Sequence, residues 1–132
     1  MRLLIDTNIF LEILLNQTHA DEAKDFLRKG DQHEFFITDF ALHSIGLILL
    51  RQRKPEVFRQ FLNDMIVNAG ITQLSLSPLE MEQVITAATS FRLDFDDSYQ
   101  YATAERYDLI IVSFDSDFDR TVRGRTLPMT IV

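Results

Sequence analysis

The sequence predicts a single α/β domain over residues 1–132, built as a three-layer α/β/α sandwich around a mainly parallel central sheet. Short apolar runs typical of strands alternate with longer segments whose apolar residues recur at helical spacing, a pattern that favours parallel strands covered by helices on both faces. No repeat, linker or low-complexity tract suggests a second domain, and 132 residues suffice for one hydrophobic core.

The first third of the chain predicts two strands joined by two helices. Arg2–Ile5 is a short apolar run, and Thr7–Leu15 follows with apolar residues at helical spacing. His19–Lys29 has the pattern of a second helix, for which Gly30 is a suitable C-terminal stop. Glu34–Thr38, with the sequence EFFIT, is rich in residues that favour strands.

The middle of the chain predicts two further helices and a third strand. Asp39 opens a helix that runs to about Leu50 and is apolar on nearly all sides, so we expect it to be buried or to lie at a subunit interface. We expect a homodimer formed through apolar helical surface, for which the candidate residues are Phe40, Ile45, Ile48 and Leu49. Pro55 suits the first turn of the next helix, which ends at Gly70, and Ile71–Leu74 is a strand candidate.

The last third predicts two helices and a fourth strand. Ser77 is a good N-cap, with Pro78 next and Glu80 completing a capping box, so a helix begins here. Residues 96–106 form another expected helix, and Leu109–Val112 another strand.

Composition limits the chemistry and the location of the protein. The chain has no cysteine, which excludes disulfides and thiolate metal sites and leaves oxygen or histidine ligands. Asp6, Asn8 and Glu12 interrupt the apolar N-terminal segment, so we expect neither a signal peptide nor a membrane span, and a cytoplasmic protein.

The net charge of −7 is concentrated in one segment. Between Asp94 and Asp119 the sequence holds eight acids and one base, Arg106, whereas the remaining residues hold twelve of each. Charge runs are usually solvated surface. An excess confined to 26 residues is also what a cation site produces.

Several of the aspartates follow predicted strands. Asp6 follows the first strand, Asp39 the second and Asp115 the last, while Asp97 opens a helix and Asp94 could share its face. Each of Asp6, Asp39 and Asp97 could simply be a helix cap. In parallel sheets, however, ligands bind beyond the carboxyl ends of the strands, so these acids are expected to converge there.

Converging carboxylates repel one another and need protons or a divalent cation. Hard oxygen ligands favour Mg²⁺ or Mn²⁺. A calcium loop beginning at Asp115 is excluded, because Arg120 stands where glycine is required and Thr126 where glutamate is required. A phospho-acceptor receiver domain is excluded because no lysine follows Lys54.

Two stretches, LLIDTNIFLEIL and LDFDDSYQYATAERYDLIIVSFDSDFDR, resemble the PIN-domain family and most of all its VapC-type toxins. The resemblance covers nearly the whole chain and implies a PIN-like fold. It implies that Asp6 is a metal ligand with Thr7 and Asn8 as polar companions. It also makes Asp97 the acid that opens the helix, Asp115 the acid after the strand, and Asp117 the acid before Phe118.

One position departs from the family pattern. The family expects a glutamate early in the helix after the second strand, and in TDFALHSIG that position holds Ser44. Asp39 is the first candidate to supply the missing carboxylate as a metal ligand, and Glu12 is the second. His43 could be a ligand or a base, and it ranks below Asp39 because a lone histidine on an apolar helix is more often a core or interface residue.

The resemblance implies a metal-dependent endoribonuclease, the toxin of a type II toxin-antitoxin pair, with RNA as substrate and an antitoxin as partner. Asp6, Asp97 and Asp115 would bind the principal metal, Asp117 would hold a second metal or orient water, and Asn8 would fix Asp6 by hydrogen bonding. Two basic groups are candidates for phosphate contacts: Arg51, Arg53, Lys54 and Arg59, and then Arg120, Arg123 and Arg125.

Two other functions remain open. A PIN-like binding module that lost catalysis with its glutamate would keep dimer or antitoxin contacts. Phosphatase chemistry is a weaker alternative, because DSDFD resembles an Asp-x-Asp motif but lies after the last strand instead of the first.

Overall fold

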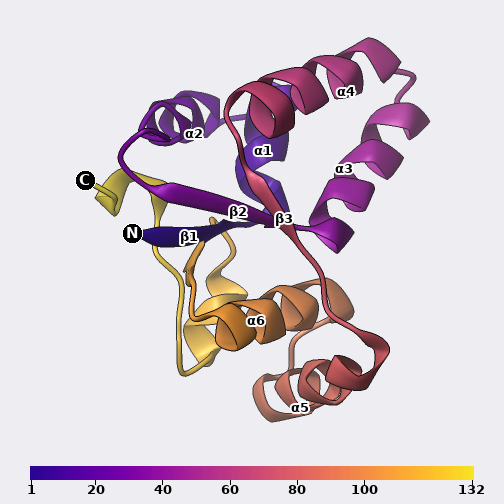
Figure 1. The fold of residues 1–132 in the computed structure, drawn as a ribbon, viewed down its shortest axis with the longest axis vertical. Coiled ribbons are helices and arrows are strands. Elements are labelled where there is room, and N and C mark those ends of the chain that lie inside the picture. Colours follow the sequence, from indigo (N-terminus) through magenta and orange to yellow (C-terminus); the bar gives the residue numbers. More distant parts are fainter.

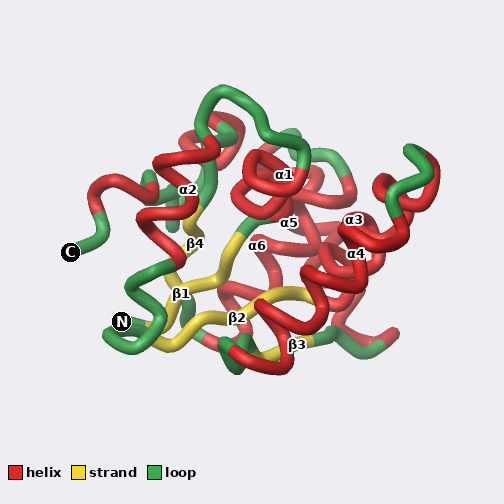
Figure 2. The backbone as a smooth tube through the Cα atoms, turned by 90° about the horizontal axis from the view of Figure 1, so that it is seen from above, coloured by secondary structure: helices red, strands yellow, loops and turns green.

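The computed structural model describes residues 1–132 and contains one four-stranded parallel sheet. The strands lie in the order β3-β2-β1-β4, and Figure 2 shows them side by side in this order. Their bounds are β1 Arg2–Ile5, β2 Glu34–Thr38, β3 Thr72–Leu74 and β4 Ile110–Val112. The predicted parallel sheet is confirmed, with each strand within a residue or so of its expected position.

Helices cover both faces of the sheet, which confirms the three-layer prediction. Figure 1 shows α1 to α4 on one side of the strands and α5 and α6 on the other. Their bounds are α1 Thr7–Leu14, α2 Ala20–Leu27, α3 Asp39–Arg51, α4 Pro55–Phe61, α5 Met81–Phe91 and α6 Phe95–Tyr107. No helix is both long and apolar enough to span a membrane.

Short irregular helices complete the chain. The segment expected to be one helix from Pro55 to Gly70 is α4 continued by a π-helical turn, Leu62–Asn68. The capping box at Ser77 is confirmed, and it opens a 3₁₀ turn, Pro78–Glu80, that leads into α5. Two more 3₁₀ turns, Ser116–Arg120 and Pro128–Thr130, follow β4.

The alternating residues of β1 supply both halves of the core. Leu3 and Ile5 point into the cluster under α1 to α4, whereas Leu4 packs with Tyr101 and Ile111 on the α6 side. All three β1 residues are fully buried. Burial on both faces explains why this strand reads as a continuous apolar run.

The surface of α3 differs from the expectation for self-association. Ile45 and Leu49 are fully buried in the core and so cannot contact a second subunit, which corrects that part of the prediction. Leu47 and Leu50 are instead the outward apolar residues, 52% and 55% exposed. A helix apolar on nearly all sides does not reveal which stripe faces the core.

Candidate metal centre

The site begins where two neighbouring strands end. Ile5 of β1 pairs with Val112 of β4, and the next residue, Asp6, donates its backbone N–H to the Val112 carbonyl at 3.0 Å. Asp6 therefore lies beside Ser113, which follows β4. This pairing explains how residues more than a hundred positions apart reach the same edge of the sheet.

The first turn of α6 faces this edge. Asp94 is the N-cap of α6, because its side chain accepts a 2.9 Å hydrogen bond from the Asp97 N–H. Capping by Asp94 leaves the carboxylates of Asp96 and Asp97 free to face the strand ends. Thr38 likewise caps α3, with its hydroxyl accepting from the Ala41 N–H. Neither Asp97 nor Asp39 is thus the cap of its helix.

These elements enclose a hollow of about 320 Å³ that contains four carboxylates. Its lining consists of Asp6, Thr7, Asn8, Leu11, Ser44, Leu47, Ile48, Asp96, Asp97 and Asp115. Carboxylate oxygens of Asp97, Asp115 and Asp117 also lie within 4.8 Å of one another, close enough to share one ion. Five of the residues predicted from the sequence are thus brought together, namely Asp6, Asn8, Asp97, Asp115 and Asp117.

Asp6 is held by three donors. It is only 3% exposed, and its Oδ2 accepts from Asn8 Nδ2 at 3.0 Å and from the Ser113 hydroxyl. Its Oδ1 accepts from Gln100 Nε2 on α6. Burial raises the pKa of Asp6, and the hydrogen bonds from Ser113 and Gln100 oppose the rise. The predicted hydrogen bond between Asn8 and Asp6 is therefore present.

Ser113 links the two strand ends. Besides donating to Asp6, its hydroxyl accepts from Asn8 Nδ2 at 3.2 Å and from the Asp115 N–H at 2.9 Å. Asn8 Oδ1 in turn accepts from the Phe114 N–H at 3.3 Å. This network fixes the backbone that carries Asp115.

The two acids in the first turn of α6, Asp96 and Asp97, have strongly raised pKa values. Burial, then the charges of Asp115 and Asp6, raise the pKa of Asp97 to about 8. Burial, followed by the charge of Asp6, raises the pKa of Asp96 to about 6. Carboxyl groups perturbed in this way are typical of sites that bind cations or carry out catalysis. Near neutral pH Asp97 therefore keeps its proton, whereas Asp96 is mostly ionised.

Asp115 and Asp117 are held differently. The Asp115 side chain accepts from the Asp117 N–H at 2.8 Å, which closes the 3₁₀ turn after β4. Asp117 Oδ1 forms an ion pair with Arg120 at 2.9 Å. Asp117 thus already has a positive partner within the chain.

The candidates for the missing carboxylate lie elsewhere. Asp39 Oδ1 accepts from its neighbour's N–H and from the Tyr99 hydroxyl at 2.7 Å, and Asp39 does not line the hollow. Glu12 Oε2 accepts from the His19 N–H at 2.8 Å. Ser44 does line the hollow, and its short side chain carries no charge. His43 is exposed and outside the lining.

Sequence reasoning missed three residues of the site, Asp96, Gln100 and the Ser113 that holds Asp6. Asp96 is half-buried in the hollow beside the predicted Asp97. Gln100, one helical turn after Asp96, is fully buried, and its Nε2 donates to Asp6 and at 3.3 Å to Asp96 Oδ1. For Asp96 and Gln100 the available signal was their i, i+4 spacing, which places both on the same face of α6 as the predicted Asp97.

The chemistry of the hollow fits a hydrated Mg²⁺ or Mn²⁺ ion. All of its carboxylates supply hard oxygen ligands, which these ions prefer. Two buried polar atoms, Thr7 Oγ1 and Gln100 Oε1, have no hydrogen-bond partner. Both atoms are therefore available to water, including water bound to a cation in the hollow that Thr7 lines.

The two basic groups differ in their bonding. Arg120, Arg123 and Arg125 each pair with an aspartate and also bond a backbone carbonyl, so they brace the segment after β4. In the other group Arg59 pairs with Glu56, whereas Arg51, Arg53 and Lys54 are exposed and form no ion pair. Arg51 follows Leu47 and Ile48 of the hollow by one helical turn.

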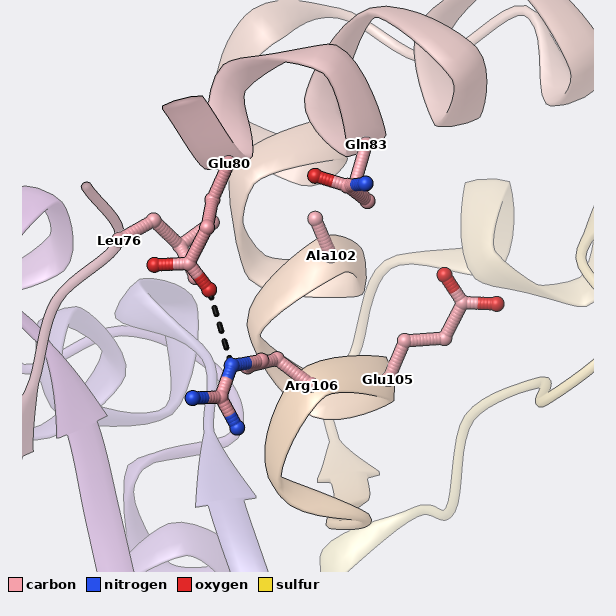
Figure 3. A pocket seen from close by; sticks show the side chains of 6 residues that line it. All are labelled: Leu76, Glu80, Gln83, Ala102, Glu105 and Arg106. Atoms are coloured by element: carbon pink, nitrogen blue, oxygen red, sulfur yellow. Dashed lines mark hydrogen bonds and ion pairs between the residues drawn. The ribbon is translucent and has the colours of Figure 1, made fainter. Parts of the chain in front are cut away.

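A larger hollow, of about 520 Å³, lies between the start of α5 and the outer face of α6 (Figure 3). The ion pair between Glu80 and Arg106, at 3.0 Å, forms one side of it. Gln83 and Glu105 lie on the other side, and no third acid converges there. The smaller hollow is therefore the better candidate site, because it gathers four carboxylates.

Comparisons with known proteins agree with this architecture. Residues 3–124 match the sequence model of the PIN domain. No curated protein matches significantly in sequence.

Solved structures match over almost the whole chain. A toxin-antitoxin complex from Klebsiella pneumoniae has a TM-score of 0.71 at 20% identity, covering 97% of this chain and 98% of that one. VapC20 from Mycobacterium tuberculosis has a TM-score of 0.77 at 14% identity, covering 96% and 99%. VapBC2 from Rickettsia felis, bound to a promoter DNA fragment, has a TM-score of 0.77 at 14% identity, covering 95% and 96%. At these identities the structures show a shared fold, and together with the sequence match they show that the chain belongs to the PIN domain family.

Proposed function

We propose that this protein is a Mg²⁺- or Mn²⁺-dependent endoribonuclease and the toxin of a toxin-antitoxin pair. The observation that carries the proposal is the convergence of Asp6, Asp97 and Asp115 in one hollow at the carboxyl edge of the sheet. PIN domain membership and the toxin-antitoxin complexes among the structural neighbours support it. VapC20, described as a toxin that cleaves the sarcin-ricin loop, supports RNA as the substrate class.

The chain's own residues prepare the site for phosphodiester hydrolysis. Asp6, Asp97 and Asp115 would hold the principal metal, with Asp117 placed to hold a second ion or orient water. Asn8, Ser113 and Gln100 orient Asp6 through the hydrogen bonds described above. A divalent ion bound here would lower the pKa of its coordinated water and neutralise charge on the phosphate.

RNA contact requires positive charge outside the acidic hollow. Arg51 and Lys54, exposed and without ion pairs, extend from the end of α3 next to the hollow. The arginines after β4 are less suited to this role, since their guanidinium groups are already bound to aspartates and backbone carbonyls. We therefore assign phosphate binding to the group at the junction of α3 and α4.

A second candidate function is favoured by one observation. Ser44 lines the hollow where the family pattern expects a glutamate, so the natural site has lost one carboxylate. A protein weakened in this way would act as a binding module that retains dimer or antitoxin contacts. In that case Ser44→Glu would create cleavage that the parent protein lacks.

The deciding experiment measures cleavage of end-labelled single-stranded and stem-loop RNAs in Mn²⁺, in Mg²⁺ and in EDTA. We expect cleavage that requires the metal and falls by at least about a hundredfold in an Asp6→Asn, Asp97→Asn double variant. The matched control is Asp25→Asn, Asp64→Asn, which removes the same charge from two exposed positions outside the hollow. Equal cleavage by the parent and the Asp6, Asp97 double variant would contradict the proposal.

A further inference from the structure

The hollow contains one acid that neither the strand-end rule nor the family pattern explains. Asp96 lies in the first turn of α6, half-buried, beside Asp6, Asp97 and Asp115. Its only side-chain hydrogen bond is the 3.3 Å contact from Gln100 Nε2, and no cation of the chain pairs with it. Asp96 is therefore a carboxylate with unused ligand capacity that faces the proposed metal position.

Gln100 joins Asp96 to the principal acid. Its amide nitrogen donates both to Asp6 Oδ1 and to Asp96 Oδ1, so the two carboxylates lie on either side of one NH₂ group. The amide orientation is determined by this contact, because a flipped Gln100 would place its oxygen against both carboxylates. Gln100 is completely buried, so its position is held by the packing of α6.

The unpartnered atoms point to what the hollow binds. Gln100 Oε1 and Thr7 Oγ1 are buried without partners, and Thr7 lines the hollow with 6% exposure. Because the chain leaves both atoms without a partner, each is available to water, including water held by a cation in the hollow. This observation is independent of the acids themselves.

Ser44 lies in the same hollow, but its side chain has no carboxylate with which to bind a metal ion. Asp39 is committed to Tyr99, Glu12 to the His19 backbone and Asp117 to Arg120. Besides the three proposed ligands Asp6, Asp97 and Asp115, Asp96 is the one other acid that lines the hollow, and it forms no ion pair.

We infer that Asp96 supplies the fourth carboxylate of the metal centre, in place of the glutamate missing at position 44, and that Gln100 is the positioning residue that sets Asp6 and Asp96 around the ion. The inference rests on the proposed function, since it assigns a ligand to the same site. The missing acid on α3 is thus replaced from the first turn of α6.

The test is isothermal titration of the metal-free full chain with Mn²⁺ near pH 7.5 and 0.15 M salt. Asp96→Asn is expected to weaken the Mn²⁺ Kd by about tenfold or more, because a charged ligand becomes a neutral one. Asp25→Asn is the matched control: it removes the same charge from an exposed side chain outside the hollow. We expect its Kd to stay within about twofold, because that charge is solvent-screened.

Two further variants show that a carboxylate is what matters. Adding Ser44→Glu to Asp96→Asn is expected to recover most of the lost Mn²⁺ affinity, since it returns an acid to the hollow from α3. Asp96→Glu keeps the charge and is expected to keep the Kd within about fivefold, which separates loss of a ligand from misfolding. Melting in EDTA checks that each variant is folded.

The outcomes separate this inference from the proposed function. If Asp96→Asn binds Mn²⁺ like the parent while Asp6→Asn does not bind, the inference is wrong and the metal centre stands. An Asp96→Glu protein as weak as Asp96→Asn would also overturn it. If the parent chain binds no Mn²⁺, both the inference and the proposed function fail.

Discussion

The Tyr99 hydroxyl donates a 2.7 Å hydrogen bond to Asp39 Oδ1 and also accepts one from the Leu76 N–H at 2.9 Å. This contact joins α6 to the start of α3 and to the segment after β3. Burial, and then the hydrogen bond to Asp39, raise the pKa of Tyr99 to about 12, so the phenol remains a donor at physiological pH. Asp39 is thereby used as a structural acceptor.

Asp39→Asn is expected to leave Mn²⁺ affinity within about twofold of the parent and to lower the free energy of unfolding by about 1 kcal/mol, because a charge-assisted hydrogen bond becomes a neutral one. Tyr99→Phe should cost about 1–3 kcal/mol, since it also leaves the Leu76 N–H unpaired. Urea denaturation and Mn²⁺ titration measure the two effects. A loss of Mn²⁺ binding in Asp39→Asn would restore Asp39 as a ligand.

The metal-free protein is expected to lose stability as the pH rises from about 4 to about 8. The folded-state pKa values of Asp96, about 6, and Asp97, about 8, exceed the ordinary value of 3.8, so the native state binds more protons than the unfolded state in this window. The stabilising protons are fully present at the low end and are lost as the pH passes through the folded values. We expect a fall in melting temperature of roughly 5–10 °C in EDTA. Saturating Mn²⁺ at pH 8 should reverse most of it, and a flat or rising profile in EDTA would contradict the prediction.

Asp97→Asn should separate stability from metal binding. Removing the carboxyl group whose pKa is raised to about 8 is expected to raise the melting temperature of the metal-free protein at pH 8 by several degrees and to flatten the pH profile. The same change should abolish the stabilisation that Mn²⁺ gives the parent. Asp108→Asn is the control, since Asp108 is exposed and its left-handed backbone, φ 55°, suits asparagine. Differential scanning fluorimetry with and without Mn²⁺ reports both effects.

The exposed cations at the end of α3 should govern RNA affinity. The double variant Arg51→Gln, Lys54→Gln is expected to weaken RNA binding about tenfold at 0.1 M salt. The slope of the logarithm of RNA affinity against the logarithm of salt concentration should fall by the equivalent of up to about two released counterions, and Mn²⁺ affinity should not change. Arg53 is left in place because its φ of 59° would strain most replacements. Lys24→Gln with Arg28→Gln, on α2, is the charge-matched control. Equal RNA binding by both double variants would move the phosphate contacts elsewhere.

Self-association is expected to use the outward stripe of α3. Leu50 is 55% exposed beside the similarly exposed Leu47, one helical turn away. Leu50→Lys should shift the protein from dimer to monomer in sedimentation velocity, whereas Val67→Lys, at a position 71% exposed on the π-helical turn, should not. A parent chain that sediments as a monomer at every accessible concentration would contradict this prediction.

The fold was largely predictable because apolar residues recur at helical spacing in the helices and form short continuous runs in the strands. Leu3, Leu4 and Ile5 are all buried, and such continuous runs mark the strands of a parallel sheet. The end of α4 was less predictable, because a π-helical turn leaves no strong sequence signal. The outward stripe of α3 was missed because Leu and Ile occupy both its buried and exposed sides.

For the site, sequence reasoning succeeded where backbone topology decides position. Asp6 and Asp115 follow strands that are neighbours in the sheet, so their proximity follows from the strand-end rule. Sequence reasoning was less successful where side-chain hydrogen bonds determine the role of a residue. Which of Asp94, Asp96 and Asp97 caps α6 depends on helix phase, and the commitment of Asp39 to Tyr99 depends on a contact 60 residues away.

The pairing of β1 with β4 has a consequence for synthesis of the protein. Asp6 leaves the ribosome early, but its hydrogen-bond partner Ser113 lies 107 residues later, and Asp115 follows that. A nascent chain that ends before β4 has neither the neighbouring strand nor Ser113 and Asp115. The chain therefore cannot complete its metal centre during most of translation, and a product truncated before β4 lacks one of the four carboxylates of the hollow and the hydroxyl that holds Asp6.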